Sequence, residues 1–282
     1  VMQLLSIGSD AKTPKGEAPG IKTAVQYLAP SKASVVINVC KWASDACIEA
    51  CLYFAGRASF DANIPKARIN RTRFFVDDRK GYSLQLIKET NSHIKSATTK
   101  NFIPMVRLNG TSDLPWEKIK VKGTDSEYDG KTLMEIFPSV QFYDYTKAPI
   151  NERFLLPSNY HLTYSRSEKS TQEDISNNLK NNRNVAIVFN ACIRNNKGKC
   201  HNKCKCPLPK ISQLSNDILN KELRDSLARK FNDIMIDGDK HDIRPLDEQG
   251  NIVGLRAKGK ARWETKGFTV HVYNQIQTTG GN

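Results

Sequence analysis

The chain has 282 residues, of which 39% are hydrophobic and 26% are charged. This composition is typical of a folded globular protein and excludes collagenous, low-complexity and broadly disordered chains. Its 43 lysine and arginine residues, against 29 aspartate and glutamate residues, give a net charge of +14. A positive field of this size attracts polyanions, so we expect nucleic acid as a partner. No apolar run approaches the roughly 20 residues of a membrane span, and no export signal is visible, so we expect a cytoplasmic protein without a membrane partner.

The N-terminal third predicts a loop, a strand and a helix. Residues 1–37 are rich in glycine and lysine and predict a loop-like lead-in, which ends in the apolar run "SVVINV" as a strand just before Cys40. Residues 75–101 predict a helix, because apolar side chains recur at helical spacing and Asp77 or Asp78 precedes them as a cap. The predicted buried face of this helix consists of Tyr82, Leu86 and Ile94.

From there the pattern alternates between short strands and helices. A short helix is predicted at "KTLMEIF", and a second helix begins after Thr171. The predicted strands lie at 102–110, 140–146, 160–165 and 184–190. Such alternation predicts an α/β protein with a mostly parallel sheet, as a full or partial TIM-like barrel. In these folds the chemistry takes place at the carboxyl ends of the strands.

Residues 191–232 interrupt this pattern with a loop rich in cysteine and lysine, followed by an amphipathic helix. We interpret them as a metal-binding insertion. The rest, residues 1–190 and 233–275, then forms one barrel-like domain, and it ends in short strands and turns.

The seven cysteines fall into two tight groups, Cys40, Cys47 and Cys51, and Cys192, Cys200, Cys204 and Cys206. An odd number in clusters favours metal binding in a reducing compartment over a disulfide framework. The alternative is that the first three are small buried hydrophobic residues. Three thiolates would leave one iron of a [4Fe–4S] cluster open, as in the radical SAM enzymes, which bind S-adenosylmethionine there. The second group predicts another iron–sulfur cluster or a zinc site.

Basic residues near the second group and near the C-terminus are candidates for contacts to phosphates. The C-terminal run also contains Trp263, which can stack on a base. The alternative for that run is a solvated hairpin. The candidate nucleic-acid-binding residues are Lys199, Lys203, Lys205, Arg256, Lys258, Lys260 and Arg262.

Polar side chains follow the predicted strands. Asp113 comes after a buried strand and is a candidate for binding a ribose hydroxyl or an ammonium group, although it could instead cap the next helix. Asp144 and Lys147 flank the end of the next strand along the chain. We take these three as candidate catalytic residues, because strand ends converge at the mouth of a barrel.

The strings "NVCKWASDACIEACLYFAGR", "VRLNGTSDLPWE" and "LPSNYHLTYSRSE" resemble a family of phage proteins named for gene product eighty-eight. More loosely, the order of these strings is similar to that of phage-associated radical-SAM-like proteins. The resemblance implies a radical-SAM-like fold that works in the cytoplasm of a phage-infected bacterium. It also implies that the strand-end residues that contact the cofactor or cosubstrate are Thr111, Ser112, Asp113, Ser165 and Glu168.

The leading hypothesis is a radical-SAM-like iron–sulfur protein that acts on or with nucleic acid. Two alternatives stay open. One is a non-enzymatic nucleic-acid-binding protein with structural metal sites, and the other is a transglycosylase-type base-exchange enzyme that uses Asp113 and Asp144. The sequence leaves open whether the chain is an enzyme, which reaction it would catalyse and which oligomer it forms.

Overall fold

A computed structural model describes residues 2–7, 20–31, 33–51, 53, 60–190 and 207–272. Within these ranges the chain is mixed α/β, with nine strands and six α-helices, and no described helix is long and apolar enough to cross a membrane. The chain divides into two compact units, which are described separately below. Unit 1 comprises residues 1–43, 52–163 and 240–247, and unit 2 comprises residues 44–51, 164–239 and 248–282.

The described strands hydrogen-bond in the order β1-β2-β3-β4-β5-β6-β8-β7, and β9 pairs with β6. Only β1 (Leu5–Ile7) is antiparallel to its neighbour, β2 (Ile21–Gln26), and the other pairings of described register are parallel. The predicted mostly parallel sheet is therefore confirmed. Because β1 and β7 stand at opposite ends of this order, the sheet of the described residues is not closed, and the predicted TIM-like barrel is not confirmed.

The sheet of unit 1 consists of β1, β2, β3 (Ile103–Arg107), β4 (Gln141–Thr146) and the first residues of β5 (Tyr160–Ser165). Successive side chains of a strand point to opposite faces, and both faces of this sheet are buried. On one face, Ala24, Val106 and Phe142 join the main core. On the other face, Met105 and Tyr143 form a smaller cluster with Ile21 and Ile243, the latter from the returning segment 240–247.

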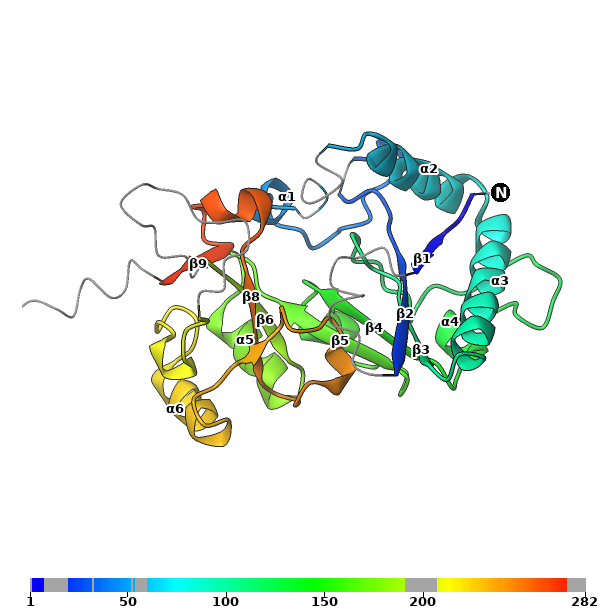
Figure 1. Cartoon of the computed structure of the whole chain (residues 1–282). Coiled ribbons are helices and arrows are strands. Elements are labelled where there is room, and N and C mark those ends of the chain that lie inside the picture. Colours follow the sequence, from blue (N-terminus) through cyan, green and yellow to red (C-terminus); the bar gives the residue numbers. More distant parts are fainter. Residues whose placement is uncertain are drawn as a thin grey trace, which may run out of the picture. The chain divides into compact units, whose positions relative to one another are not determined.

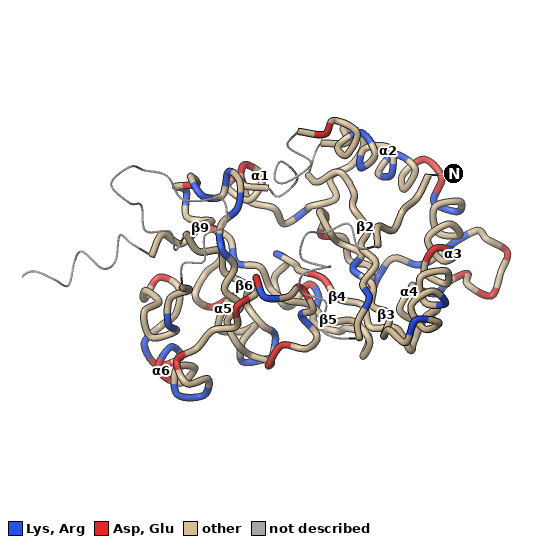
Figure 2. Tube along the Cα trace, viewed as in Figure 1, with Lys and Arg blue, Asp and Glu red and all other residues tan. Residues whose placement is uncertain are grey.

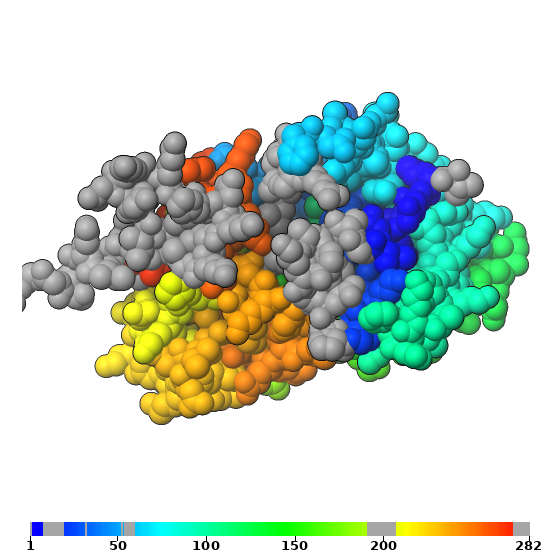
Figure 3. All heavy atoms as spheres, viewed as in Figure 1, coloured from blue at the N-terminus to red at the C-terminus, as the bar shows by residue number. Residues whose placement is uncertain are grey.

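Helix α3 (Arg79–Thr98) packs beside β1 and β2 (Figures 1 and 3). The Asp78 carboxylate caps it by accepting from the Gly81 N–H at 2.7 Å, and Tyr82 and Leu86 lie buried as predicted. Helix α2 (Asn63–Asp77) precedes α3, carries several lysines and arginines (Figure 2), and was not predicted. Helix α4 (Leu133–Ile136) begins with a capping box at Thr132, where a helix was predicted.

Two N-terminal predictions were wrong. The lead-in 1–37 contains β1 and β2, whose short alternating patterns are hidden between glycine- and lysine-rich stretches. The run "SVVINV" forms a turn and not a strand, since the Ser34 hydroxyl donates to the Ile37 carbonyl at 3.1 Å. Val35 adopts a positive φ of 66° there and is 88% exposed, which no buried strand permits. Cys40 therefore follows a turn.

Unit 2 contains α1 (Asp45–Glu49), the end of β5 and the elements that follow it. The strands are β6 (Val185–Asn190), β7 (Ile236–Asp237), β8 (Ile252–Arg256) and β9 (Thr269–His271), and the helices are α5 (Gln172–Lys180) and α6 (Lys221–Lys230). The strands predicted at 160–165 and 184–190 are confirmed as β5 and β6, and Thr171 caps α5 as predicted.

The segment after the cysteine-rich loop packs into the core of unit 2. Ile211 and Leu219 contribute to the cluster that contains Ile187, Phe189 and Ile252. Helix α6 begins after Asn220 and is therefore shorter than the predicted amphipathic helix. The predicted separation of residues 191–232 as an insertion stays a prediction, because residues 191–206 lie outside the described residues.

Candidate functional site

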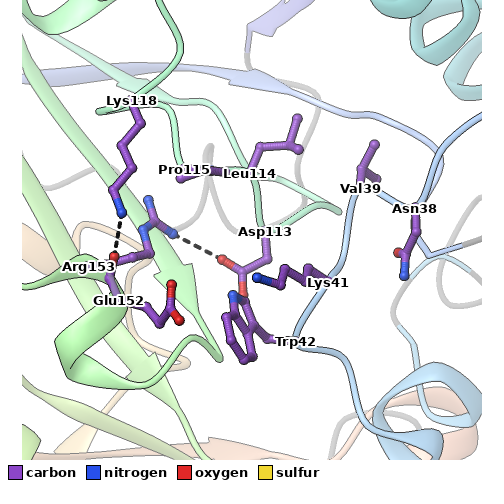
Figure 4. A pocket seen from close by; sticks show the side chains of 10 residues that line it. All are labelled: Asn38, Val39, Lys41, Trp42, Asp113, Leu114, Pro115, Lys118, Glu152 and Arg153. Carbon is purple, nitrogen blue, oxygen red and sulfur yellow. Dashed lines mark hydrogen bonds and ion pairs between the residues drawn. The ribbon is translucent and has the colours of Figure 1, made fainter.

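A cavity of about 250 Å³ lies in unit 1 beyond the carboxyl ends of β3 and β4 (Figure 4). Its lining combines an apolar surface from Val39, Leu114 and Pro115 with the ring of Trp42 and with charged side chains of both signs. The full lining consists of Asn38, Val39, Lys41, Trp42, Asp113, Leu114, Pro115, Lys118, Glu152 and Arg153. The position matches the expectation that ligands of parallel α/β sheets bind at the carboxyl ends of the strands.

The loop after β3 is shaped by its own hydrogen bonds. The Asn109 amide oxygen accepts from the Ser112 hydroxyl at 2.8 Å and from the Leu114 N–H at 2.9 Å, which turns the chain toward the cavity. A Cβ at Gly110 would lie 2.6 Å from the Gln26 carbonyl oxygen, so this position requires glycine. The Asp113 N–H then donates to the Val39 carbonyl at 2.8 Å and joins this loop to the turn that carries Lys41 and Trp42.

Asp113 lines the cavity and is held on both sides. One carboxylate oxygen accepts from Arg153 Nη1 at 3.0 Å, and the other accepts from the Lys147 N–H at 2.7 Å. Burial raises the pKa of Asp113 above its ordinary value, although Arg153 and the Lys147 N–H oppose the shift. Asp113 therefore joins the loop after β3 to the end of β4 and presents a partly buried carboxylate to the cavity.

Arg153 is 3% exposed and forms a forked pair with Glu117, in which Nε donates at 2.9 Å and Nη2 at 2.7 Å. Burial alone would lower the pKa of Arg153, but Tyr160, Glu117 and Asp113 together raise it above its ordinary value. The guanidinium group is therefore permanently charged and balances two carboxylates at the wall of the cavity.

Asp144 lies beneath this wall and does not line the cavity. It is fully buried, and its carboxylate accepts from the Asn109 N–H at 2.7 Å and from the Tyr160 hydroxyl at 2.8 Å. Burial raises the pKa of Asp144 to about 7. The Tyr160 oxygen also accepts from Arg153 Nη2 at 3.1 Å, so hydrogen bonds connect Asp144 to the cavity wall.

Two lysines supply exposed positive charge at this cavity. The Lys41 ammonium lies 4.5 Å from the centroid of the Trp42 ring, and Lys118 donates to the Glu152 carbonyl at 2.7 Å. Both lysine side chains are exposed, whereas Trp42 is half-buried. An aromatic face beside lysine ammonium groups can hold a planar ring and an attached anion.

The predicted cofactor contacts Thr111 and Ser112 form hydrogen bonds within unit 1. Thr111 donates to the Leu28 carbonyl at 2.6 Å, and the Ser112 hydroxyl donates to Asn109. The Cys40 thiol lies 3.7 Å from the Thr111 carbonyl oxygen and packs against the main core. Thr111 and Ser112 thus shape the loop, and their roles as cofactor contacts stay predictions.

In unit 2, Glu168 holds the start of the short helix α1, which contains Cys47 and is followed by Cys51. Its carboxylate accepts from the Ser44 hydroxyl at 2.6 Å and from the Ala46 N–H at 3.1 Å. The Ser44 oxygen in turn accepts from the Cys47 N–H at 3.3 Å. Glu168 therefore fixes the start of α1, while Ser165 lies half-buried at the end of β5. Whether either residue contacts a cofactor stays a prediction.

The three described cysteines are each half-buried, with Cys40 in unit 1 and Cys47 and Cys51 in unit 2. Among the described residues, no group of three or more histidine, cysteine, aspartate or glutamate side chains could hold a metal ion. The second predicted group, Cys192, Cys200, Cys204 and Cys206, lies outside the described residues. Both metal sites therefore stay predictions.

The predicted basic residues of unit 2 are largely engaged within the unit. Arg256 pairs with Asp237 at 2.8 Å, Lys258 pairs with Asp239 at 2.9 Å, and Arg262 Nε donates to the Ala257 carbonyl at 3.3 Å. Lys260 is exposed, and its neighbour Trp263 is 62% exposed. The remaining candidates, Lys199, Lys203 and Lys205, lie outside the described residues.

Of the ten lining residues only Asp113 was predicted, and the charged or aromatic ones that were missed are Lys41, Trp42, Lys118, Glu152 and Arg153. Lys41 and Trp42 are adjacent inside the cysteine-containing stretch, and an aromatic residue next to a cation is the sequence signal that indicates them. Arg153 gave no local signal, because its partner Asp113 lies forty positions earlier in the chain.

These features define a mixed α/β protein with a mostly parallel sheet and a small charged cavity at the carboxyl ends of two adjacent strands. The chain belongs to the gene product 88 family, whose model matches residues 3–272. The resemblance drawn from the sequence is thereby confirmed. No curated protein and no solved structure matches the chain.

Proposed function

We propose that this protein binds nucleic acid and that the cavity of unit 1 receives one nucleotide. The observation that carries the proposal is that Trp42, Lys41 and Lys118 line one cavity, with the Lys41 ammonium beside the Trp42 ring, in a chain of net charge +14. In this arrangement a base stacks on the Trp42 ring, and the two ammonium groups attract the adjacent phosphate.

The cavity also offers polar contacts to a sugar or a base edge. A carboxylate has about four acceptor positions, and Asp113 uses three of them for Arg153, the Lys147 N–H and the Thr146 side chain. The remaining position can accept from a ribose hydroxyl or an exocyclic amine. A volume of about 250 Å³ lies below the roughly 300–1,000 Å³ of pockets for drug-sized ligands, which suits a single nucleotide unit.

Binding of a short single-stranded oligonucleotide, followed by fluorescence anisotropy, tests this proposal. We expect Trp42→Ala to weaken binding about tenfold, because stacking on an aromatic side chain contributes about 1–3 kcal/mol per base. Phe60→Ala is the matched control, since it removes an exposed aromatic ring of unit 1 that does not line the cavity, and it should leave oligonucleotide binding unchanged.

Two results would overturn the proposal. One is that Trp42→Ala binds the oligonucleotide as tightly as the parent chain. The other is that S-adenosylmethionine displaces the oligonucleotide while methionine does not, and that its own binding is lost in Trp42→Ala. The cavity would then belong to the cofactor implied by the family resemblance, which also carries an adenine ring.

The iron–sulfur hypothesis is tested separately by metal content. If Cys40, Cys47 and Cys51 bind a [4Fe–4S] cluster, anaerobic reconstitution with iron and sulfide gives a brown protein. Cys40→Ala should then lower the iron content by about the four atoms of this cluster, with a matching loss of colour, and Ala33→Ser, in the turn before it, should not. A reconstituted chain that stays colourless and carries only zinc would contradict the hypothesis.

A further inference from the structure

Helix α2 carries four cations within fifteen residues and a single acidic residue, Asp77, at its C-terminal end. The cations are Lys66, Arg68, Arg71 and Arg73. They divide into two pairs. Arg68 and Arg71 pack against other residues of unit 1, whereas Lys66 and Arg73 are exposed to solvent.

The inner pair belongs to the packing of unit 1. The Arg68 guanidinium lies 5.0 Å from the centroid of the Tyr27 ring and 5.3 Å from that of Tyr53. Arg71 Nε donates to the Gln3 carbonyl at 2.7 Å. Thr72, one turn after Arg68, is buried and accepts from the Ala29 N–H at 2.8 Å. The inner side of α2 is therefore held by the N-terminal part of unit 1.

The outer pair points into solvent. Lys66, Asn70 and Arg73 are all exposed and follow one another at intervals of four and three residues, which places them on one side of the helix. Seven residues of helix rise about 10 Å, so the two cations mark the ends of a short polar stripe. Neither cation forms an ion pair within the described part of the chain. Figures 2 and 3 show α2 at the surface of unit 1.

We propose that the outer stripe of α2, formed by Lys66, Asn70 and Arg73, is a contact surface for the sugar–phosphate backbone of nucleic acid. The inference rests on the proposed nucleic-acid binding and adds a second contact surface outside the cavity. Exposed cations without carboxylate partners, in a chain of +14, complement a polyanion. Duplex DNA carries one charge per about 1.7 Å of its axis, so cations about 10 Å apart find phosphates in any register. The Asn70 amide adds a donor for a phosphate oxygen.

Salt-dependent binding to a 20-base-pair duplex tests the inference. The double variant Lys66→Gln, Arg73→Gln should lower the slope of log K against log salt concentration by about 1.8, because each phosphate contact contributes about 0.9. The matched control is Lys88→Gln, Lys95→Gln on α3, which removes two exposed cations with the same spacing of seven residues. The control should leave the slope within about 0.5 of the parent value. The thermal midpoints of both variants should match that of the parent, since all four side chains are exposed.

An equal decrease of the salt-dependence slope in the two double variants would overturn the inference, because binding would then depend on net charge alone and not on the position of the cations on α2. Loss of binding to anionic phospholipid vesicles, with duplex binding unchanged, would overturn it in favour of a lipid surface. If the parent chain binds neither duplex nor single strand, the proposed function itself fails. If Trp42→Ala weakens single-strand binding while Lys66→Gln, Arg73→Gln changes nothing, only the inference on α2 fails.

Discussion

Replacing Arg153 with methionine is expected to lower the free energy of unfolding by about 3–5 kcal/mol, the usual cost of removing one partner from a buried ion pair. Arg153 is 3% exposed and balances Glu117, whose side chain is 2% exposed, as well as Asp113. Methionine fills part of the same space, but the two carboxylates and the Tyr160 hydroxyl lose the donors and the positive charge of Arg153. Chemical denaturation of the parent chain and the variant, followed by circular dichroism, measures the difference.

The control is Arg73→Met, which removes an exposed arginine from α2 and should change stability by less than about 0.5 kcal/mol. Adding Glu117→Gln to Arg153→Met should recover part of the loss, because one uncompensated carboxylate is then neutral. A loss below about 1 kcal/mol in Arg153→Met, or no recovery in the double variant, would show that the pair contributes little to stability.

The second large effect is a dependence of stability on pH that comes from Asp144. Its pKa is about 7 in the folded chain, raised by burial from an ordinary value of 3.8. Between these two values the folded state binds more protons than the unfolded state. The free energy of unfolding therefore falls as the pH rises from about 4 to about 7, and the loss is complete above that range. At about 1.4 kcal/mol per pH unit, the total is on the order of 4 kcal/mol.

Asp144→Asn isolates this contribution, because asparagine does not titrate. The stability difference, parent minus variant, should fall as the pH rises from 4 to 7, as measured by urea denaturation at each pH. Asn70→Gln, an exposed change on α2 that involves no titratable group, should give a flat difference over the same range. A difference that rises with pH would show that the donors from Asn109 and Tyr160 keep Asp144 ionised, against the effect of burial.

The regular elements could be predicted where the periodicity was long or the caps were explicit. Helix α3 has both, with Asp78 as its cap and Tyr82 and Leu86 on its buried face. Strand β2 was missed, because its six residues lie next to a stretch rich in glycine and lysine. The run at 34–39 was misread because apolar composition does not distinguish a buried strand from an exposed turn. That choice depends on tertiary contacts.

The candidate site could be predicted only in part. The rule that parallel strands place function at their carboxyl ends led to Asp113, which the structure places in the wall of the cavity. The same rule selected Asp144, but the structure shows it fully buried under hydrogen bonds. The cations around Asp113 come from distant parts of the sequence, and a sequence pattern cannot show such a juxtaposition before the fold is known.

The two units are interleaved along the chain. Residues 44–51 belong to unit 2 although both of their flanks belong to unit 1, and residues 240–247 belong to unit 1 although both of their flanks belong to unit 2. Ile243, from the second of these segments, completes the cluster of Ile21, Met105 and Tyr143. No single cut therefore releases either unit whole. A fragment ending near residue 163 would expose that apolar cluster, so the two units must be made and studied as one polypeptide.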